Sequence, residues 1–326
     1  MTVSRSALHR LDAIPTLTPT LAPTPVEELG RLRAALGGGP RLFIKRDDAI
    51  PFGFGGNKIR KLQIVAAQAL THRADTLITA GGIQSNHARA TAAVAATLGL
   101  DCILVANGPP PAKLTANALL DRLLGADVRY VASRDERAAA MEEAASDLRA
   151  RGRRPFVIPL GASTPHGAAA YAKAVGELLT QLPAPDTIFL STSSGGTQAG
   201  VIAGCRLHGL STRVVGISAD DPSPAIGATI QRILEGLEPL VGISAGELTS
   251  APIEVDDRFV GEGYGIPTPQ STEAIELCAR REGIFLDPTY TAKAMAGLIA
   301  RIRGGELPSG AVLFWHTGGQ VGLFAM

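Results

Sequence analysis

The chain has 326 residues, of which 45% are hydrophobic and 19% are charged. This length favours one large or two modest domains, and the apolar content excludes intrinsic disorder as the main state. The formal net charge of +1 creates no general field for nucleic acid or an anionic membrane, and no run is apolar enough to span a bilayer, so neither partner is expected.

Short β-rich runs alternate with Ala/Leu-rich stretches of helical period, which predicts βαβ units and a mainly parallel sheet. A first strand is expected at Arg41–Lys45, and a helix is expected at Ile59–Leu70. Four strands with helices between them form one compact unit: Thr76–Ala80, Cys102–Ala106, Asp127–Val131 and Pro155–Pro159. Four later strands form a second sheet: Thr187–Ser191, Arg213–Ser218, Ile253–Val255 and Val312–His316.

The order of these elements predicts an α/β protein with two parallel-sheet domains, the smaller inserted in the larger. We expect the first strand to join the later sheet, so that residues 1–60 and 171–326 form the larger domain. Residues 61–170 then form the smaller α/β domain, and a ligand cleft is expected between the two.

Lys58 stands in an unusual setting in a chain that has six lysines and 25 arginines. It follows residues 53–57, whose glycines let the backbone approach a ligand closely, and it comes at the start of the predicted helix. Such a lysine can form a Schiff base, whereas the alternative is a surface residue in the first helical turn. The other lysines are expected to be weaker candidates, and those in helical patterns to be solvated: Lys45, Lys61, Lys113, Lys173 and Lys293.

Two polar loops lead from a strand end into a helix. Residues 79–87 pass through two glycines to Ser85, Asn86 and His87, whose side chains and free backbone N–H groups suit a carboxylate; simple N-capping is the alternative. Residues 191–200 form a loop of Ser, Thr and Gly, which predicts a phosphate site rather than a flexible turn. This loop matches neither a Walker loop nor a dinucleotide fingerprint, so ATP and NAD are disfavoured as its ligands.

The C-terminal third contains two tyrosines in loop settings. Tyr264 between two glycines and Tyr290 after Asp-Pro can place phenol hydroxyls in a cleft, although a packing role is the alternative for each. Residues 242–246 match the G-x-S-x-G pattern of serine hydrolases around Ser244. No β-rich strand precedes that match and no helical pattern follows it, so this assignment is disfavoured.

The cysteines, Cys102, Cys205 and Cys278, are odd in number and widely spaced, so neither a disulfide framework nor a cysteine metal knuckle is expected. The six histidines are scattered and form no close ligand pair, so no metal is expected. The N-terminus lacks a basic cap on a long apolar run. Together these features predict a cytoplasmic protein.

These segments, in this order, resemble the D-cysteine desulfhydrase and 1-aminocyclopropane-1-carboxylate (ACC) deaminase family of pyridoxal-phosphate enzymes, which have the tryptophan synthase β-like fold. The resemblance covers nearly the whole chain. It rests on six ordered motifs: Ile44–Asp48, Gly55–Lys58, Ile83–His87, Gly263–Gly265, Leu286–Thr291 and His316–Gly319.

The resemblance implies that Lys58 holds pyridoxal 5'-phosphate as a Schiff base and later acts as the base for the substrate α-proton. Ser85 and its loop are implied to bind the substrate carboxylate, while Tyr264 and Tyr290 line the face where bonds break. His166 is the candidate to meet an anionic β substituent. The remaining implied cofactor or substrate contacts are Asn57, Asn86, His87, Ser194, Gly195, Gly196, Thr197, Thr291 and Thr317, and the family pattern is broken at Ala162, Ser193 and Ala292.

The leading expectation is a homodimeric lyase that converts D-cysteine to pyruvate, sulfide and ammonia by α,β-elimination. L-Cysteate sulfo-lyase, which releases sulfite, is the nearest alternative. ACC deaminase is less favoured, because ring-opening members look to carry Glu after the second tyrosine and Gln after Ser-Asn, where this chain has Thr291 and His87. A serine hydrolase using Ser244 and a non-catalytic ligand-binding protein are remote alternatives.

Overall fold

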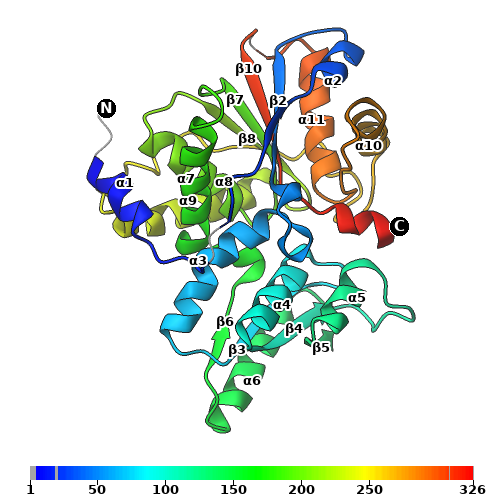
Figure 1. The fold of residues 1–326 in the computed structure, drawn as a ribbon. Coiled ribbons are helices and arrows are strands. Elements are labelled where there is room, and N and C mark those ends of the chain that lie inside the picture. The colour runs from blue at the N-terminus through cyan, green and yellow to red at the C-terminus, as the bar shows by residue number, and fades with distance from the viewer. Residues whose placement is uncertain (1–4, 19–20, 308, 326) are drawn as a thin grey trace.

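The computed structural model describes residues 5–18, 21–307 and 309–325, and its strands form two separate sheets (Figure 1). The larger sheet has the strand order β1 (Val26–Glu28), β2 (Arg41–Arg46), β10 (Ala311–His316), β7 (Thr187–Thr192), β8 (Arg213–Ser218) and β9 (Glu254–Asp256). The smaller sheet has the order β5 (Asp127–Val131), β4 (Asp101–Asn107), β3 (Thr76–Gly82) and β6 (Pro155–Val157).

The predicted fold class is confirmed, and the strand at Arg41 joins the larger sheet as expected. One strand was not predicted. β1 pairs with β2 in antiparallel orientation, so the larger sheet is mixed rather than wholly parallel. Its three residues, Val-Glu-Glu, lie at the edge of the sheet and are not buried, so they carry neither the apolar run nor the alternation that marks a strand.

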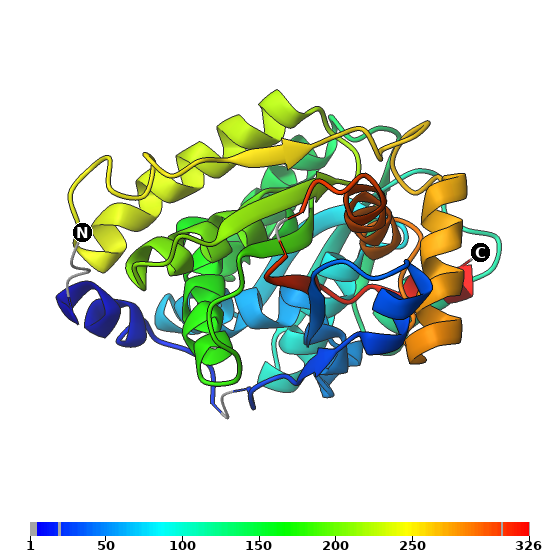
Figure 2. The ribbon, with the colours of Figure 1, turned by 90° about the horizontal axis from the view of Figure 1, so that it is seen from above.

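Helices cover both faces of the larger sheet (Figures 1 and 2). One face packs on α1 (Arg5–Asp12), α7 (Pro165–Leu179), α8 (Gly196–Leu207) and α9 (Ser223–Val241). The other face packs on α2 (Gly30–Ala35), α10 (Pro269–Glu282) and α11 (Thr291–Arg303). Strand β2 serves both layers, because Phe43 points to the first core while Leu42 and Ile44 point to the second. Burial on both faces explains why this strand reads as a continuous apolar run.

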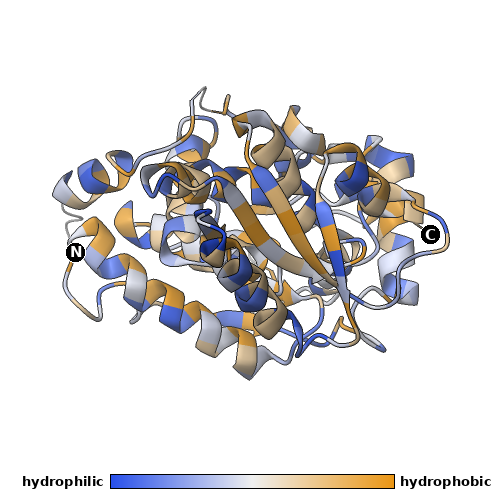
Figure 3. Ribbon diagram, turned by 90° about the horizontal axis from the view of Figure 1, so that it is seen from below, coloured by the Kyte–Doolittle hydropathy of each residue, from blue (hydrophilic) through white to orange (hydrophobic). Residues whose placement is uncertain are grey.

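The smaller sheet is also covered on both faces. The helices α3 (Asn57–Thr71) and α4 (Asn86–Leu98) pack on one face, and α6 (Arg137–Ala150) packs on the other. The short helix α5 (Ala116–Leu123) packs beside α4. Figure 3 shows apolar residues concentrated on the central strands, whereas the outer helices alternate between polar and apolar positions. In the described part of the chain, no helix has the length and apolar character needed to cross a membrane.

Helices α3 and α7 pack against each other where the chain passes between the two sheets. The domain boundaries at 60/61 and 170/171 stay a prediction, and in the structure each falls inside one of these helices. Helix α3 begins two residues earlier than expected, which places Lys58 in its first turn. The contact between α3 and α7 is therefore the part of the fold that positions Lys58 relative to the larger sheet.

Candidate active site

A cleft lies where the loops after the C-terminal strand ends of the two sheets meet. Parallel α/β sheets bind ligands at this edge, because loops and helix N-termini converge there. The lining includes these residues of the predicted site: Asn57, Lys58, Ser85, Asn86, His87, Ser194, Gly195, Thr197, Tyr264, Tyr290 and Thr317. Segments more than 250 residues apart in the sequence are thus brought together in one cleft.

The two glycine-containing motifs around Lys58 and after β10 fit each other backbone to backbone. Asn57 N donates to Thr317 O at 2.9 Å, and Gly56 N donates to Asp47 O at 2.8 Å. A Cβ on Gly318 would lie 2.5 Å from Gly56 Cα, so a side chain there would separate the two loops. Glycine at these positions lets the loops touch, and the contact fixes the start of α3 and with it Lys58.

The surroundings of Lys58 change the properties of its amine. Burial lowers the pKa of Lys58 to about 8, although the negative charge of Asp220 acts in the opposite direction. A Cβ on Gly161 would lie 3.3 Å from Lys58 Nζ and would collide with the Ser194 hydroxyl, so glycine keeps open the space between them. A lysine that is partly neutral at ordinary pH can act as a nucleophile or a base.

The N-terminus of α8 is where the phosphate cradle is predicted, and its geometry suits an anion. Gly195 adopts a left-handed conformation with φ of 75°, and no side chain caps the helix at that residue. The first-turn N–H groups of α8 and the hydroxyls of Ser194 and Thr197 lie at the end of the cleft that adjoins Lys58. Asn57 Nδ2 donates to Thr197 Oγ1 at 2.9 Å, which ties the lysine loop to the cradle. Convergent donors at a helix N-terminus bind an anion.

Lys61 is a second lysine of the site, and the expectation that it is solvated was wrong. Its side chain is fully buried, and Lys61 Nζ donates to Gly161 O and Ser163 Oγ, both at 3.2 Å. Ser163 Oγ in turn lies 2.8 Å from Ser194 Oγ and accepts from Gly196 N. Lys61 follows Lys58 by one helical turn, so the spacing of three residues was a usable signal.

Two other lysines are also buried, contrary to the expectation for Lys293. Lys293 Nζ donates to Val260 O at 2.7 Å and Gly263 O at 2.8 Å, which fixes the loop that carries Tyr264. Lys45 belongs to an ionic network beneath the site.

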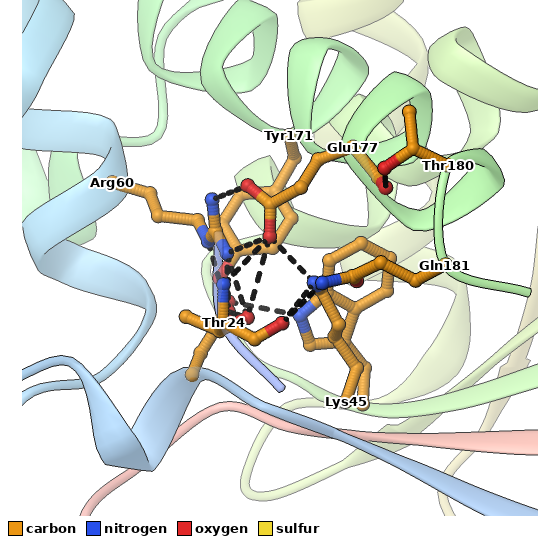
Figure 4. Close-up of polar contacts among 9 residues, drawn as sticks. Thr24, Lys45, Arg60, Tyr171, Glu177, Thr180 and Gln181 are labelled. Carbon is orange, nitrogen blue, oxygen red and sulfur yellow. Dashed lines mark hydrogen bonds and ion pairs between the residues drawn. The ribbon is translucent and has the colours of Figure 1, made fainter. Parts of the chain in front are cut away.

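That network joins β2, α3, α7 and β10 around the buried carboxylate of Asp47, and its members Arg60 and Glu177 are labelled in Figure 4. Asp47 accepts hydrogen bonds from the side chains of Thr24, Arg60, Tyr171 and Trp315 at distances of 2.5 to 3.0 Å. Glu177 pairs with Arg60 at 2.8 Å and with Lys45 at 2.5 Å, so two carboxylates meet two cations. Because Arg60 follows Lys58 closely in the first turn of α3, these bonds also hold the lysine in place.

Ser85 begins α4 as its N-cap residue, and Ser85 Oγ accepts from Ala88 N at 3.2 Å. Ser85 therefore both caps α4 and lines the cleft. His87 Nε2 lies 2.8 Å from Thr79 Oγ1, and burial, aided by the charges of Lys58 and Lys61, lowers the pKa of His87 well below its usual value. The imidazole is thus neutral and contacts the end of β3, while the first turn of α4, capped by Ser85, lines the cleft.

Tyr264 and Tyr290 approach each other, with 2.6 Å between their hydroxyl oxygens. Burial raises the pKa of Tyr290 well above its usual value, and the neighbouring Tyr264 acts in the same direction. Both phenols line the same cleft as Lys58. A phenol that stays protonated can donate a hydrogen bond to a group on the substrate.

Three predicted residues do not line the cleft. His166, in the first turn of α7, is absent from the lining, so its expected contact with the substrate loses support. Thr291 is fully buried, and its hydroxyl donates to Asp287 Oδ1 at 2.7 Å, which leaves it a structural role at the start of α11. Gly196 contributes to the site through its backbone N–H, which donates a hydrogen bond to Ser163 Oγ.

Ser244 has no nucleophile elbow. It is exposed in the loop that follows α9, where Gly242 ends the helix in a left-handed conformation. The elbow of a serine hydrolase needs a strand that turns directly into a helix. The serine hydrolase alternative therefore has no structural support at this position.

Sequence reasoning missed three charged residues of the cleft, Arg134, Arg137 and Asp220. Arg134 and Arg137 follow β5, and Asp220 follows β8. Their position after the carboxyl ends of parallel strands was the available signal, because loops at that edge carry ligand contacts. Isolated charges in loops otherwise look like ordinary surface residues.

A cleft between two α/β units, with a partly neutral lysine beside an anion cradle, defines an enzyme that holds a phosphorylated carbonyl cofactor. The sequence model of the pyridoxal-phosphate dependent enzyme family matches residues 17–318. A crystal structure of an ACC deaminase homologue shares 36% sequence identity with a TM-score of 0.91, covering 98% of this chain and 97% of that one. The chain belongs to the family of pyridoxal-phosphate-dependent enzymes.

More distant structures share the fold. A threonine deaminase from T.th. is 20% identical with a TM-score of 0.70, covering 97% of this chain and 97% of that one. A maize serine racemase is 18% identical with a TM-score of 0.68, covering 97% of this chain and 92% of that one.

The residues present fit pyridoxal phosphate. The uncapped N-terminus of α8 suits the phosphate, and Lys58 suits the aldehyde. Ser191 Oγ and Thr192 Oγ1, at the end of β7, are buried in the cleft wall without a hydrogen-bond partner in the described part of the chain. Unpartnered buried hydroxyls are costly, so they indicate polar groups of a ligand.

Proposed function

We propose that this enzyme is a carbon–sulfur lyase that catalyses α,β-elimination on a small β-substituted amino acid, with D-cysteine as the leading substrate. The products are pyruvate, sulfide and ammonia. The observation that carries the proposal is the position of Lys58 beside the phosphate cradle, with Tyr264 and Tyr290 in the same cleft. When bound, pyridoxal phosphate withdraws electrons from the substrate α-carbon.

Residues of the chain bind the substrate carboxylate, remove the α-proton and contact the departing group. Ser85 and the N-terminus of α4 bind the substrate α-carboxylate, which the helix dipole favours. With pyridoxal phosphate and substrate bound, the free Lys58 amine would take the α-proton, and its lowered pKa suits a base that works near neutral pH. Tyr264 and Tyr290 face this part of the cleft and donate hydrogen bonds toward the departing group.

Elimination is favoured over opening of the ACC ring because position 291 offers no carboxylate. The Thr291 hydroxyl donates to Asp287, and its side chain is buried outside the cleft lining. A carboxylate beside the pyridine nitrogen would keep that nitrogen protonated and deepen the electron sink. The similarity to an ACC deaminase homologue keeps ACC as a substrate to be tested.

The experiment compares pyruvate formation by cofactor-loaded enzyme from D-cysteine, L-cysteine and L-cysteate, with 2-oxobutyrate assayed from ACC. Dominant pyruvate and sulfide from D-cysteine is the expected result, and Lys58→Ala should remove it. Sulfite from L-cysteate as the main product would make the second candidate, a sulfo-lyase, the correct one. Dominant 2-oxobutyrate would overturn elimination, and cofactor binding without turnover of any substrate would favour a binding protein.

We also propose that the enzyme works in the cytoplasm. Its three cysteines are buried and unpaired, which suits a reducing compartment.

A further inference from the structure

Two arginines extend the cleft beyond the groups used so far. Arg134 lies in the loop after β5, and Arg137 is the first residue of α6. Both belong to the cleft lining, in which Asp220 is the sole carboxylate among the described residues. The lining therefore has more cationic than anionic side chains, because Lys58, Lys61, Arg134 and Arg137 face the single Asp220.

Arg134 has an acidic partner. Arg134 Nη2 lies 2.9 Å from Asp220 Oδ2, and its guanidinium carbon lies 5.4 Å from the ring centroid of Tyr264. The pair joins a loop of the smaller sheet to a loop of the larger one across the cleft. Asp220 thus neutralises Arg134 and holds it over the tyrosine.

Arg137 is not neutralised in this way. Its Nη2 donates to the neutral amide oxygen of Asn107, and its Nε is buried without a hydrogen-bond partner in the described part of the chain. No acidic residue lies in the first turn of α6, where the helix dipole already disfavours a cation. Burial, aided by the charge of Arg134, lowers the pKa of Arg137, although Tyr264, Tyr290 and Asp220 act in the opposite direction. A half-buried guanidinium in this state would be stabilised by an anion.

Arg137 lies in a different part of the cleft from the groups assigned to the cofactor phosphate. A Cβ on Gly82 would lie 3.9 Å from both Asn107 Oδ1 and Tyr264 Cε1, so Arg137 and its partner stand on the tyrosine side of the cleft. The phosphate cradle adjoins Gly161 and Lys61 instead. Arg137 is therefore free for a group on the substrate side chain.

We propose that Arg137, held beside the Arg134–Asp220 pair, is a specificity-determining residue that binds an acidic group on the substrate β-carbon, most simply a sulfonate. The proposal rests on the lyase function above and, within it, favours the second candidate substrate, L-cysteate, over D-cysteine. In that reaction the Cα–H and Cβ–S bonds break, and sulfite leaves with the electron pair of the Cβ–S bond. The Cα–Cβ double bond forms, and one water then releases pyruvate and ammonium without net oxidation or reduction.

Binding of an unreactive analogue tests the residue apart from the chemistry. The ligand 3-sulfopropanoate carries the carboxylate and sulfonate of cysteate without its amine, and propanoate lacks the sulfonate. By calorimetry, the cofactor-loaded enzyme should prefer 3-sulfopropanoate, and Arg137→Met should reduce this preference roughly 10- to 100-fold, as expected for a lost charged hydrogen bond. Arg137→Lys should keep part of it. Arg149→Met, on the exposed part of the same helix, is the matched control.

Turnover gives a second readout. The ratio of kcat/KM for L-cysteate to that for D-cysteine should fall by a similar factor in Arg137→Met and stay unchanged in Arg149→Met. An unchanged binding preference in Arg137→Met, with normal melting and cofactor absorbance, would overturn the inference and leave the lyase proposal standing. If the wild-type enzyme turns over neither substrate but loses its sulfonate preference in Arg137→Met, the lyase proposal fails and the anion subsite stands.

Discussion

Burial gives the Lys58 amine a pKa of about 8, compared with 10.5 for an ordinary lysine. Only the neutral amine attacks an aldehyde, so covalent capture of pyridoxal phosphate by the apoenzyme should slow about tenfold for each pH unit below 8. Above that value the rate should level off. Stopped-flow absorbance over a range of pH measures this profile, and a rate that keeps rising to a midpoint near 10 would contradict the assigned environment.

Gly196 is a second residue with a measurable role. A Cβ there would lie 2.6 Å from Ser163 Oγ and 2.8 Å from Ser163 Cα, so alanine must displace the segment that links Lys61 to the cradle. We expect Gly196→Ala to weaken cofactor binding at least about tenfold, the effect of one lost charged hydrogen bond.

Gly227 supplies the matched control. It lies inside α9 with nothing within 4 Å of an added Cβ, and its φ is not positive. Gly227→Ala should leave cofactor affinity unchanged and raise the free energy of unfolding by roughly 0.5–1 kcal/mol, because alanine loses less backbone entropy in a helix. Equal cofactor affinity in the two variants would remove the role assigned to Gly196.

Among the secondary-structure elements, α3 and α7 depend on the network around Asp47 (Figure 4). Asp47→Asn leaves Arg60 and Lys45 facing Glu177 alone, so the free energy of unfolding should fall by about 3–5 kcal/mol, the usual cost of breaking a buried ion pair. Urea unfolding measures the loss. The exposed pair Arg149–Glu142 on α6 provides the comparison, since Glu142→Gln should change stability by less than about 1 kcal/mol.

The same network predicts a dependence of stability on acid. Burial alone would raise the pKa of Glu177, but hydrogen bonds and charge from Arg60 and Lys45 lower it to about 2 from 4.5. A carboxyl group with a lowered folded-state pKa stabilises the protein fully above pH 4.5, and that contribution is lost as the pH falls from 4.5 towards 2. Glu177→Gln should make the free energy of unfolding depend less on pH in this range. An unaltered pH dependence would show that other groups cause the acid sensitivity.

Strands and helices were largely predictable because burial on both faces gives the strands of these sheets continuous apolar runs. β2 and β10 illustrate this, whereas β1 was missed because its residues are few and not buried. The glycine loops at Gly56 and Gly196 were predictable as ligand sites, since helix starts with glycine suit anions.

Other parts of the site depend on tertiary contacts that no local pattern encodes. Lys61 and Lys293 looked like solvated helix residues, and only the packing of loops over their amines explains their burial. Arg137 was hidden for the same reason, because its significance comes from the absence of a carboxylate partner among the described residues. The contact of His166 with the substrate stays a prediction, and the cleft lining includes Gly161 from the segment before α7 but not His166.

For the molecule as a whole, we expect a homodimer, as the family resemblance implies. Large apolar side chains are exposed at Phe54, Leu123, Phe285 and Phe324, and a partner subunit that covered some of them would bury apolar area. Sedimentation should therefore give about twice the chain mass of 33.7 kDa. A species with the mass of one chain at all concentrations would contradict this expectation.

The cleft walls come from both sheets, with Ser85 and Gly161 on one side and Ser194 and Thr317 on the other. A cofactor bound in this cleft contacts residues from both sheets at once. It therefore binds the folded chain and not the unfolded one. At a free concentration of one hundred times its dissociation constant, such a ligand adds about 2.7 kcal/mol of stability. The lifetime of this enzyme in a cell should then follow the supply of vitamin B6, and mildly destabilised variants should be rescued by feeding it.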